Sequence, residues 1–133
     1  MTTTDILLVD DHTATREELL FLLSVEKDLN VVGEASSGEE AVREAERLRP
    51  DLVIMDILMP GMNGIEATRR IHSANPEVRI LTLSNHTGRG LLKATLDAGA
   101  VGYVAKDHAY EELVDAIRAV ADGGRYVGAD MDR

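Results

Sequence analysis

The sequence predicts an α/β protein in which a parallel sheet carries helices on both faces. Five short apolar runs alternate along the chain with stretches of helical length. Several of these runs are continuously apolar, which is typical of parallel strands that are buried on both faces. Right-handed crossovers between successive parallel strands then give a doubly wound sheet. The 133 residues are enough for one such domain and too few for two ordinary cores.

The apolar runs and the amphipathic stretches define ten expected elements. Strands are expected at Ile6 to Val9, Leu29 to Ala35, Leu52 to Asp56, Ile80 to Ser84 and Gly102 to Val104. Helices are expected at Thr13 to Ser24, Ser37 to Leu48, Asn63 to Ser73, Leu91 to Ala98 and Tyr110 to Ala121.

Local signals support the helix ends. Ser37 and Glu40 have the spacing of a capping box, in which the serine accepts from a backbone N–H and the glutamate reaches back. In the last helix, Leu113 and Ile117 fall on one stripe that can face the sheet. The pair Gly123-Gly124 is expected to end that helix.

Charge and composition exclude several classes of protein. The chain has 14 Lys and Arg against 24 Asp and Glu, a net charge of -10, and would be repelled by nucleic acid. No apolar run approaches the ~20 residues of a membrane span, and the first five residues lack the basic region of a secretory signal. The absence of cysteine fits a reducing compartment. We expect a cytoplasmic protein that does not bind a membrane, and does not bind nucleic acid through this segment.

Polar side chains stand at the carboxyl ends of the expected strands. Asp10 and Asp11 follow the first strand, and Asp56, Ser84 and Lys106 stand at the ends of the third, fourth and fifth. Ligands of doubly wound sheets bind at this edge. A single aspartate after a strand is commonly a cap or turn residue, but caps do not require a serine and a lysine at the remaining ends. We therefore expect these five side chains to converge.

Such a group of side chains suits phosphoryl chemistry. Carboxylates packed together raise each other's pKa or recruit a cation, and ligand sets made only of oxygen suit Mg²⁺. One carboxylate could then attack a phosphoryl group whose charge is neutralised by the metal and the lysine. The product would be an acyl phosphate.

These residues lie in motifs that resemble the receiver domain of two-component response regulators. The motifs are Val9 to His12, Ile54 to Gly64, Leu83-Ser84 and Ala98 to Lys106, each at its proper strand end. The resemblance implies a flavodoxin-like fold with a five-stranded parallel sheet of order 2-1-3-4-5. It also implies a receiver over residues 1–126, followed over 127–133 by a tail or the start of a linker.

The resemblance assigns four positions to a Mg²⁺ site. Asp11 matches the direct ligand, and Asp10 matches the partner that acts largely through metal-bound water. Asp56 and the backbone carbonyl of Leu58 supply further ligands.

The resemblance also assigns the phosphoryl contacts and the switch. Asp56 matches the phosphoacceptor, while Ser84 and Lys106 match the residues that contact the phosphoryl oxygens. Tyr103 matches the aromatic residue that, together with Ser84, switches after phosphorylation; by itself it could equally be core filling with its hydroxyl at the surface.

Three departures from the common receiver pattern bear on structure. Asp107 follows Lys106 where most receivers have a proline, so a cis peptide bond cannot be assumed. The pair Ala109-Tyr110 replaces the usual Ser-Pro start of the last helix, and the cap is expected from Asp107 or His108. Two glycines, in Gly88-Arg89-Gly90, suggest a mobile start of the fourth helix.

The implied function is a phosphorylation-dependent switch and not an enzyme with an external substrate. A sensor histidine kinase would supply the phosphoryl group, and a homodimer is possible. Asp-Asp-His at the first strand and Lys-Asp at the fifth resemble the NarL/LuxR-type subfamily, which implies transcription regulation and DNA binding through a helix-turn-helix output domain absent from this chain.

Three other readings stay open at this point. The chain could be a stand-alone receiver without DNA binding. A phosphatase of the haloacid dehalogenase type would need a second aspartate where Leu58 stands. A dinucleotide-binding domain would need a glycine-rich loop after the first strand, where the sequence has Asp10-Asp11-His12.

Overall fold

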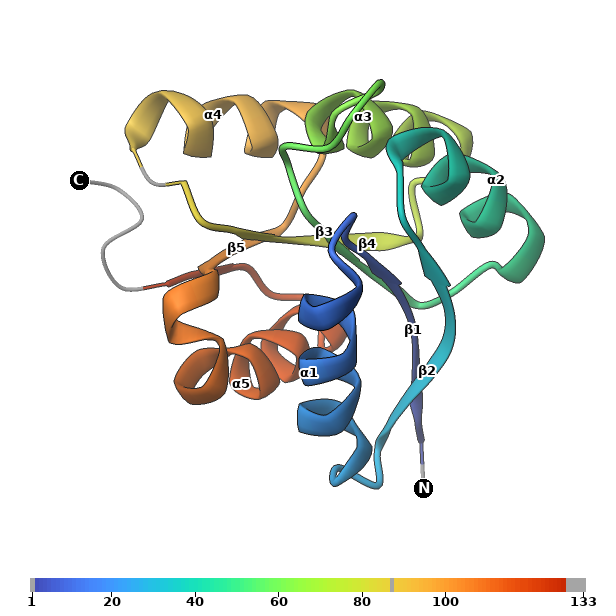
Figure 1. The fold of residues 1–133 in the computed structure, drawn as a ribbon, viewed down its shortest axis with the longest axis vertical. Coiled ribbons are helices and arrows are strands. Elements are labelled where there is room, and N and C mark those ends of the chain that lie inside the picture. The colour runs from blue at the N-terminus through green and yellow to red at the C-terminus, as the bar shows by residue number, and fades with distance from the viewer. Residues whose placement is uncertain (1, 87, 129–133) are drawn as a thin grey trace.

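A single parallel sheet organises the chain. The computed structural model describes residues 2–86 and 88–128. The sheet has the order β2-β1-β3-β4-β5-β6, and every neighbouring pair is parallel (Figure 1). Its strands are β1 Thr4–Val9, β2 Leu29–Ala35, β3 Leu52–Met55, β4 Arg79–Ser84, β5 Gly102–Ala105 and β6 Tyr126–Val127. The predicted flavodoxin-like fold and the order 2-1-3-4-5 are confirmed, with one additional strand.

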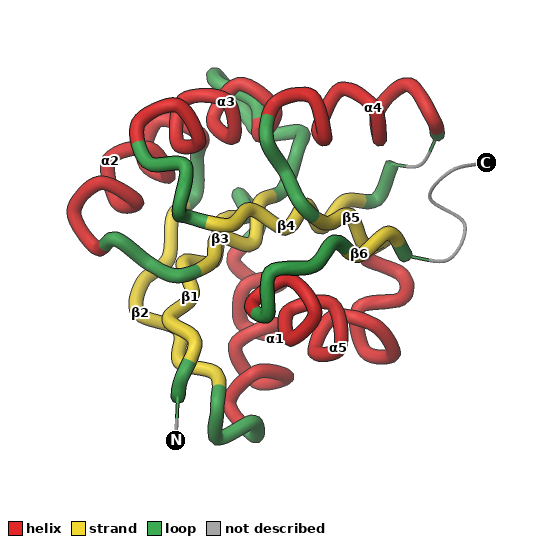
Figure 2. Tube along the Cα trace, turned by 180° about the vertical axis from the view of Figure 1, so that it is seen from behind, coloured by secondary structure: helices red, strands yellow, loops and turns green. Residues whose placement is uncertain are grey.

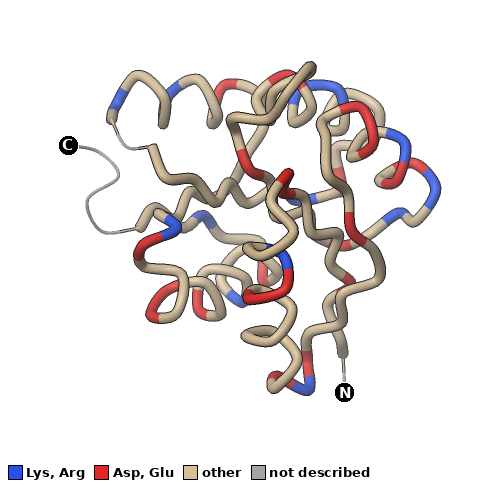
Figure 3. The backbone as a smooth tube through the Cα atoms, viewed as in Figure 1, with Lys and Arg blue, Asp and Glu red and all other residues tan. Residues whose placement is uncertain are grey.

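The helices cover both faces of this sheet. They are α1 Thr13–Ser24, α2 Gly38–Leu48, α3 Gly64–Ala74, α4 Arg89–Ala98 and α5 Ala109–Ala121. Figures 1 and 2 show α2, α3 and α4 on one side of the sheet and α1 with α5 on the other. Charged residues lie mainly in these helices and in the loops, while the strands are largely uncharged (Figure 3). Among the described helices, none is long and apolar enough to span a membrane.

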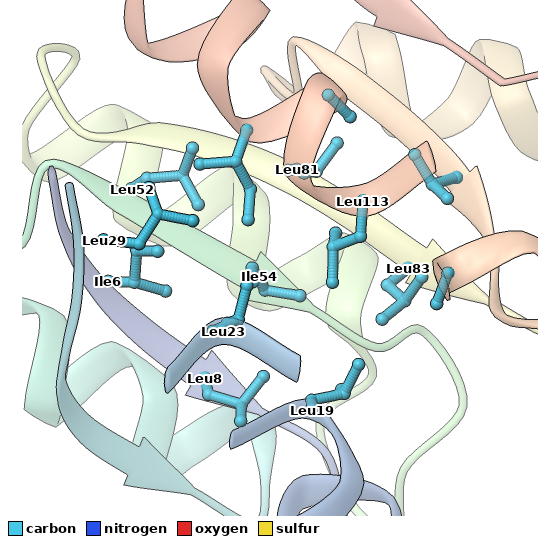
Figure 4. Packing of buried hydrophobic residues seen from close by; sticks show 14 of the residues in the cluster. Ile6, Leu8, Leu19, Leu23, Leu29, Leu52, Ile54, Leu81, Leu83 and Leu113 are labelled. Carbon is cyan, nitrogen blue, oxygen red and sulfur yellow. The ribbon is translucent and has the colours of Figure 1, made fainter. Parts of the chain in front are cut away.

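Alternation along the strands divides the core into two layers. In β1, Leu7 and Val9 pack with the buried residues of α2 and α3, whereas Ile6 and Leu8 pack with those of α1 and α5. Figure 4 shows the second layer, in which leucines of α1 and α5 lie against leucines and isoleucines of the strands. Because both faces of the central strands are covered, their sequences are continuously apolar.

The capping predictions have mixed outcomes. The Ser37 hydroxyl accepts from the backbone N–H of Glu40 at 3.1 Å, as expected, but the Glu40 carboxylate accepts from the backbone of Ser36 at 2.6 Å. His108 stands at the N-cap of α5, yet its side chain makes no capping hydrogen bond, so the prediction of a cap from His108 or Asp107 is wrong. A short 3₁₀ turn, η1 Lys106–His108, leads straight into α5, and its backbone carbonyl at Lys106 accepts from Ala109 N–H.

The sixth strand extends the sheet beyond the five that the sequence predicts. Tyr126 pairs with Gly102, Val127 pairs with Tyr103, and Gly128 N–H donates to the Tyr103 carbonyl at 2.8 Å. The predicted boundary between residues 126 and 127 falls inside this strand. The predicted tail is described as far as Gly128, and the rest of it lies outside the described residues. No cis peptide bond occurs in the described ranges, which include the bond between Lys106 and Asp107.

Candidate phosphoacceptor and metal site

The backbone of the central strands carries the candidate residues to one edge. Asp10 directly follows β1 and Asp56 directly follows β3, which is the neighbouring strand. The parallel pairing continues to these positions, because Asp10 N–H donates to Ala35 and Asp56 N–H donates to Val9, both at 3.1 Å. The two carboxylates are therefore fixed side by side by the register of the sheet.

Lys106 reaches both buried carboxylates from the end of β5. Its Nζ lies 2.7 Å from Asp10 Oδ2 and 3.2 Å from Asp56 Oδ2. The side chain of Lys106 is 13% exposed, and those of Asp10 and Asp56 are 1% and 7% exposed. The lysine and the two carboxylates thus form a nearly dry charged triad, in which the ammonium group is the cationic partner of both acids.

Burial and charge shift the pKa values of this triad. Burial raises the pKa of Asp56 and so does the charge of Asp10, while Lys106 and the N–H of Ile57, which donates at 2.8 Å, oppose the increase. Burial favours the neutral amine of Lys106, but its hydrogen bond to Asp10 and the charge of Asp56 outweigh this effect and raise its pKa. Lys106 therefore remains charged, as a group that neutralises anionic oxygens must.

Asp56 belongs to a compact group of side chains that can ligate a metal ion. One ligand atom from each of Asp10, Asp11, His12 and Asp56 lies within 4.8 Å of the others. Asp11 Oδ1 is shielded from solvent and accepts no hydrogen bond. An oxygen of this kind fits a hard divalent cation, because burial of a polar atom without a hydrogen bond is costly unless something binds it. The donor set thus fits the Mg²⁺ that the sequence predicts.

His12 belongs to this set although the sequence prediction did not include it. Its Nδ1 lies 3.1 Å from Asp11 Oδ1 and 3.4 Å from Asp10 Oδ1. The sequence contains a signal for this, since His12 directly follows the two aspartates. Only the turn after β1 shows that the imidazole ring lies beside their carboxylates.

Ser84 and Tyr103 are joined through the loop after β4. The Ser84 hydroxyl accepts from the backbone N–H of His86 at 3.1 Å, and the Tyr103 hydroxyl donates to the carbonyl of His86 at 2.9 Å. Tyr103 is 1% exposed and packs with Ile57 and Ala105 under the start of α4. Burial raises the pKa of its hydroxyl. The tyrosine is both core and hydrogen-bond partner of the loop that leads to α4.

The loop between β3 and α3 brings backbone close to Asp56. Gly64 begins α3, and a Cβ atom there would collide with the carbonyl of Asp56. The side chain of Leu58 in this loop is 57% exposed. The role of its backbone carbonyl as a metal ligand stays a prediction.

Fold and site together define a signalling domain of the two-component type, and the sequence comparisons agree. The family described as the response regulator receiver domain matches residues 6–118. The chain belongs to this family.

Two relatives and one solved structure show that the chain is similar to response regulators of the LuxR type. The response regulator UvrY of Escherichia coli K12 is 43% identical over 127 residues, which are 96% of this chain and 58% of the relative. The response regulator GacA of Pseudomonas viridiflava is 39% identical over 95% of this chain and 59% of its own length. A LuxR-family two-component response regulator from Aurantimonas sp. SI85-9A1 superimposes with a TM-score of 0.94 at 40% identity, covering 98% of this chain and 93% of that one. The chain spans a little under three fifths of the length of UvrY and GacA.

Proposed function

We propose that this receiver domain accepts a phosphoryl group on Asp56 from a phosphohistidine of a sensor kinase. A carboxylate oxygen of Asp56 forms a bond to phosphorus, the bond between phosphorus and the donor imidazole breaks, and that imidazole takes a proton from solvent. Water then removes the phosphoryl group by attack on the phosphorus of the acyl phosphate. Asp56 is regenerated, so the domain catalyses only its own modification and its reversal.

One observation carries this proposal. Asp56 is a buried carboxylate with a lysine ammonium group 3.2 Å away, and its ligand atom lies within 4.8 Å of those of Asp10 and Asp11. A bound Mg²⁺ would supply positive charge to the phosphoryl oxygens, and Asp10, Asp11 and Asp56 are the side chains that would hold it. Lys106 would neutralise another phosphoryl oxygen through a charge-assisted contact.

The contacts around Ser84 explain how modification can change the surface. Phosphorylation adds up to two negative charges and new acceptor oxygens, which the Ser84 hydroxyl and Lys106 can meet. Ser84 shares the loop residue His86 with Tyr103, so a movement of Ser84 towards the phosphoryl group disturbs the partner of the Tyr103 hydroxyl. That loop leads to α4, whose position we propose to be the output of the switch.

The relatives suggest what this output controls. UvrY and GacA are response regulators that are longer than this chain, and the Aurantimonas protein is named a LuxR-family regulator. We propose that the domain regulates transcription through a helix-turn-helix domain outside this chain. Homodimerisation of the receiver is one way in which phosphorylation could control that domain. We also propose a cytoplasmic location, with which the cysteine-free sequence agrees.

Mass spectrometry of variants tests the proposal. The protein is incubated with acetyl phosphate and Mg²⁺, and the intact mass is recorded for the wild type, Asp56→Asn and Asp51→Asn. Asp51 immediately precedes β3, at the opposite end from Asp56, and provides the matched control. We expect one phosphoryl adduct on the wild type and on Asp51→Asn, and none on Asp56→Asn. Equal modification of Asp56→Asn, or turnover of acetyl phosphate by that variant, would refute the assignment.

A further inference from the structure

The imidazole of His12 lies on the acidic cluster and is not used by the helix that it precedes. His12 is the N-cap residue of α1, but its side chain makes no capping hydrogen bond. Its backbone N–H instead donates to Asp10 Oδ1 at 2.9 Å. This tight turn folds the ring back over the carboxylates, where Nδ1 lies 3.1 Å from Asp11 Oδ1 and 3.4 Å from Asp10 Oδ1.

The Asp11 carboxylate beside this ring can accept a cation, and the buried Asp10 carboxylate lies next to it. Asp10 is 1% exposed, and its Oδ2 is paired with the Lys106 ammonium group at 2.7 Å. Asp11 Oδ1 is shielded from solvent and accepts no hydrogen bond. The ligand atoms of Asp10, Asp11, His12 and Asp56 all lie within 4.8 Å of one another. The cluster therefore offers a nitrogen donor as well as carboxylate oxygens.

We propose that His12 is a nitrogen ligand that lets this cluster bind a transition-metal dication such as Zn²⁺, in competition with Mg²⁺. The inference rests on the proposed function in one respect, namely that the same carboxylates form the Mg²⁺ site. Mg²⁺ prefers oxygen ligands, whereas imidazole nitrogen suits Zn²⁺, Ni²⁺ and Cu²⁺. Zn²⁺ is commonly held by a few histidine nitrogens and carboxylate oxygens, and one histidine with three aspartates supplies four such donors.

The exposure of the ring agrees with this role. The His12 side chain is 68% exposed and its Nδ1 faces the cluster, so a metal bound there would meet the lone pair of Nδ1 while Nε2 carries the ring proton towards water. Because Asp56 is one of the four donors, a bound Zn²⁺ would hold the phosphoacceptor carboxylate as a ligand.

Calorimetric titration of the unphosphorylated protein tests this inference. Zn²⁺ and Mg²⁺ are titrated separately into the wild type, His12→Ala, His12→Phe and His108→Ala. The phenylalanine keeps a planar ring without a nitrogen donor. His108 is the matched control, because its Nδ1 also lies 3.1 Å from a carboxylate oxygen, that of Glu111, but outside the cluster.

We expect the Kd for Zn²⁺ to rise at least about tenfold in both His12 variants and to stay unchanged in His108→Ala. The Kd for Mg²⁺ should change less than about twofold in every variant, because Mg²⁺ takes its ligands from oxygen. In the wild type, the imidazole nitrogen resonances of His12 should shift on addition of Zn²⁺ and not of Mg²⁺.

Two results would overturn the inference while leaving the proposed function intact. One is wild-type Zn²⁺ affinity in the His12 variants with normal Mg²⁺ binding. The other is tighter Mg²⁺ binding by His12→Ala, which would show that the imidazolium competes with cations as an internal counter-charge. Failure of the wild type to bind Mg²⁺ at all would instead contradict the proposed function.

Discussion

Lys106 is the residue on which the charge balance of the site depends. Its ammonium group neutralises two carboxylates that the sheet register forces together, at 2.7 Å from Asp10 and 3.2 Å from Asp56. Removal of one member of a buried ion pair leaves an uncompensated charge, which a cation can relieve.

Lys106→Ala should therefore bind Mg²⁺ several-fold more tightly than the wild type, because the ammonium group is not a ligand and no longer competes for the acids. Calorimetry measures the Kd, and Lys93→Ala is the control, since Lys93 pairs with Asp97 on the exposed face of α4. An unchanged or weaker Mg²⁺ affinity in Lys106→Ala would show that the lysine supports metal binding.

The raised pKa of Asp56 determines how the stability of the fold should depend on pH. Between the ordinary aspartate pKa of 3.8 and the raised folded value, the folded protein binds more protons than the unfolded chain, so its stability falls as the pH rises through that window. Asparagine does not titrate. Asp56→Asn should thus raise Tm by a few degrees at neutral pH, with Asp10 still pairing with Lys106.

The gain should disappear below pH 3.8, where the wild-type carboxyl is protonated in both states. Calorimetric melts across that window measure it, and a variant that melts below the wild type at neutral pH would show that the ionised carboxylate stabilises the fold.

At the scale of elements, the sequence predicts those helices and strands whose apolar residues recur with a clear period or that carry a strong motif. The alternation of apolar runs and amphipathic stretches gives all five helices and the first five strands to within a few residues. The strand β6 has only two residues, too few for any periodicity, and it forms because β5 offers an unpaired edge. The η1 turn and the place of His12 depend on backbone dihedral angles that side-chain identity does not specify.

The start of α3 shows how tightly an element fits the site. A Cβ atom on Gly64 would meet the backbone carbonyl of Asp56, which no rotamer change can relieve. Gly64→Ala should therefore cost about 1 to 3 kcal/mol of unfolding free energy and slow phosphorylation, because α3 must move away from Asp56.

Urea unfolding of Gly64→Ala measures this cost, with Gly90→Ala as the matched control. Gly90 lies in the first turn of α4, and a Cβ atom there would meet nothing within 4 Å. The control should be as stable as the wild type or more so, since alanine favours the helix. Equal stability of Gly64→Ala and the wild type would mean that α3 does not abut the site.

Across the whole molecule, Arg118 ties the last helix to the first half of the chain. It donates to Glu26 at 2.7 Å and to both carboxylate oxygens of Asp28 at 2.9 and 3.0 Å, joining α5 to the loop between α1 and β2. The hydrogen bond from Arg118 lowers the pKa of Asp28. A lowered folded pKa contributes stability that is present above the unfolded value and lost as the pH falls through the folded one.

Arg118→Gln should therefore lower Tm at neutral pH, and the deficit should shrink as the pH falls from 3.8 through the lowered pKa of Asp28. Melting curves at several pH values measure it. Arg69→Gln is the control, because Arg69 pairs with Glu66 inside α3 and joins no distant elements. A deficit in Arg118→Gln that is independent of pH would mean that the ion pair is not its cause.

The central claim is that Asp56 itself carries the phosphoryl group, and reductive trapping tests it most directly. The protein is treated with acetyl phosphate and Mg²⁺, then with borohydride, which reduces an aspartyl phosphate to homoserine, and its peptides are mapped by mass spectrometry. We predict homoserine at position 56 alone, and none when Mg²⁺ is chelated. Homoserine at Asp10, Asp11 or another position, with residue 56 recovered as aspartate, would contradict the account.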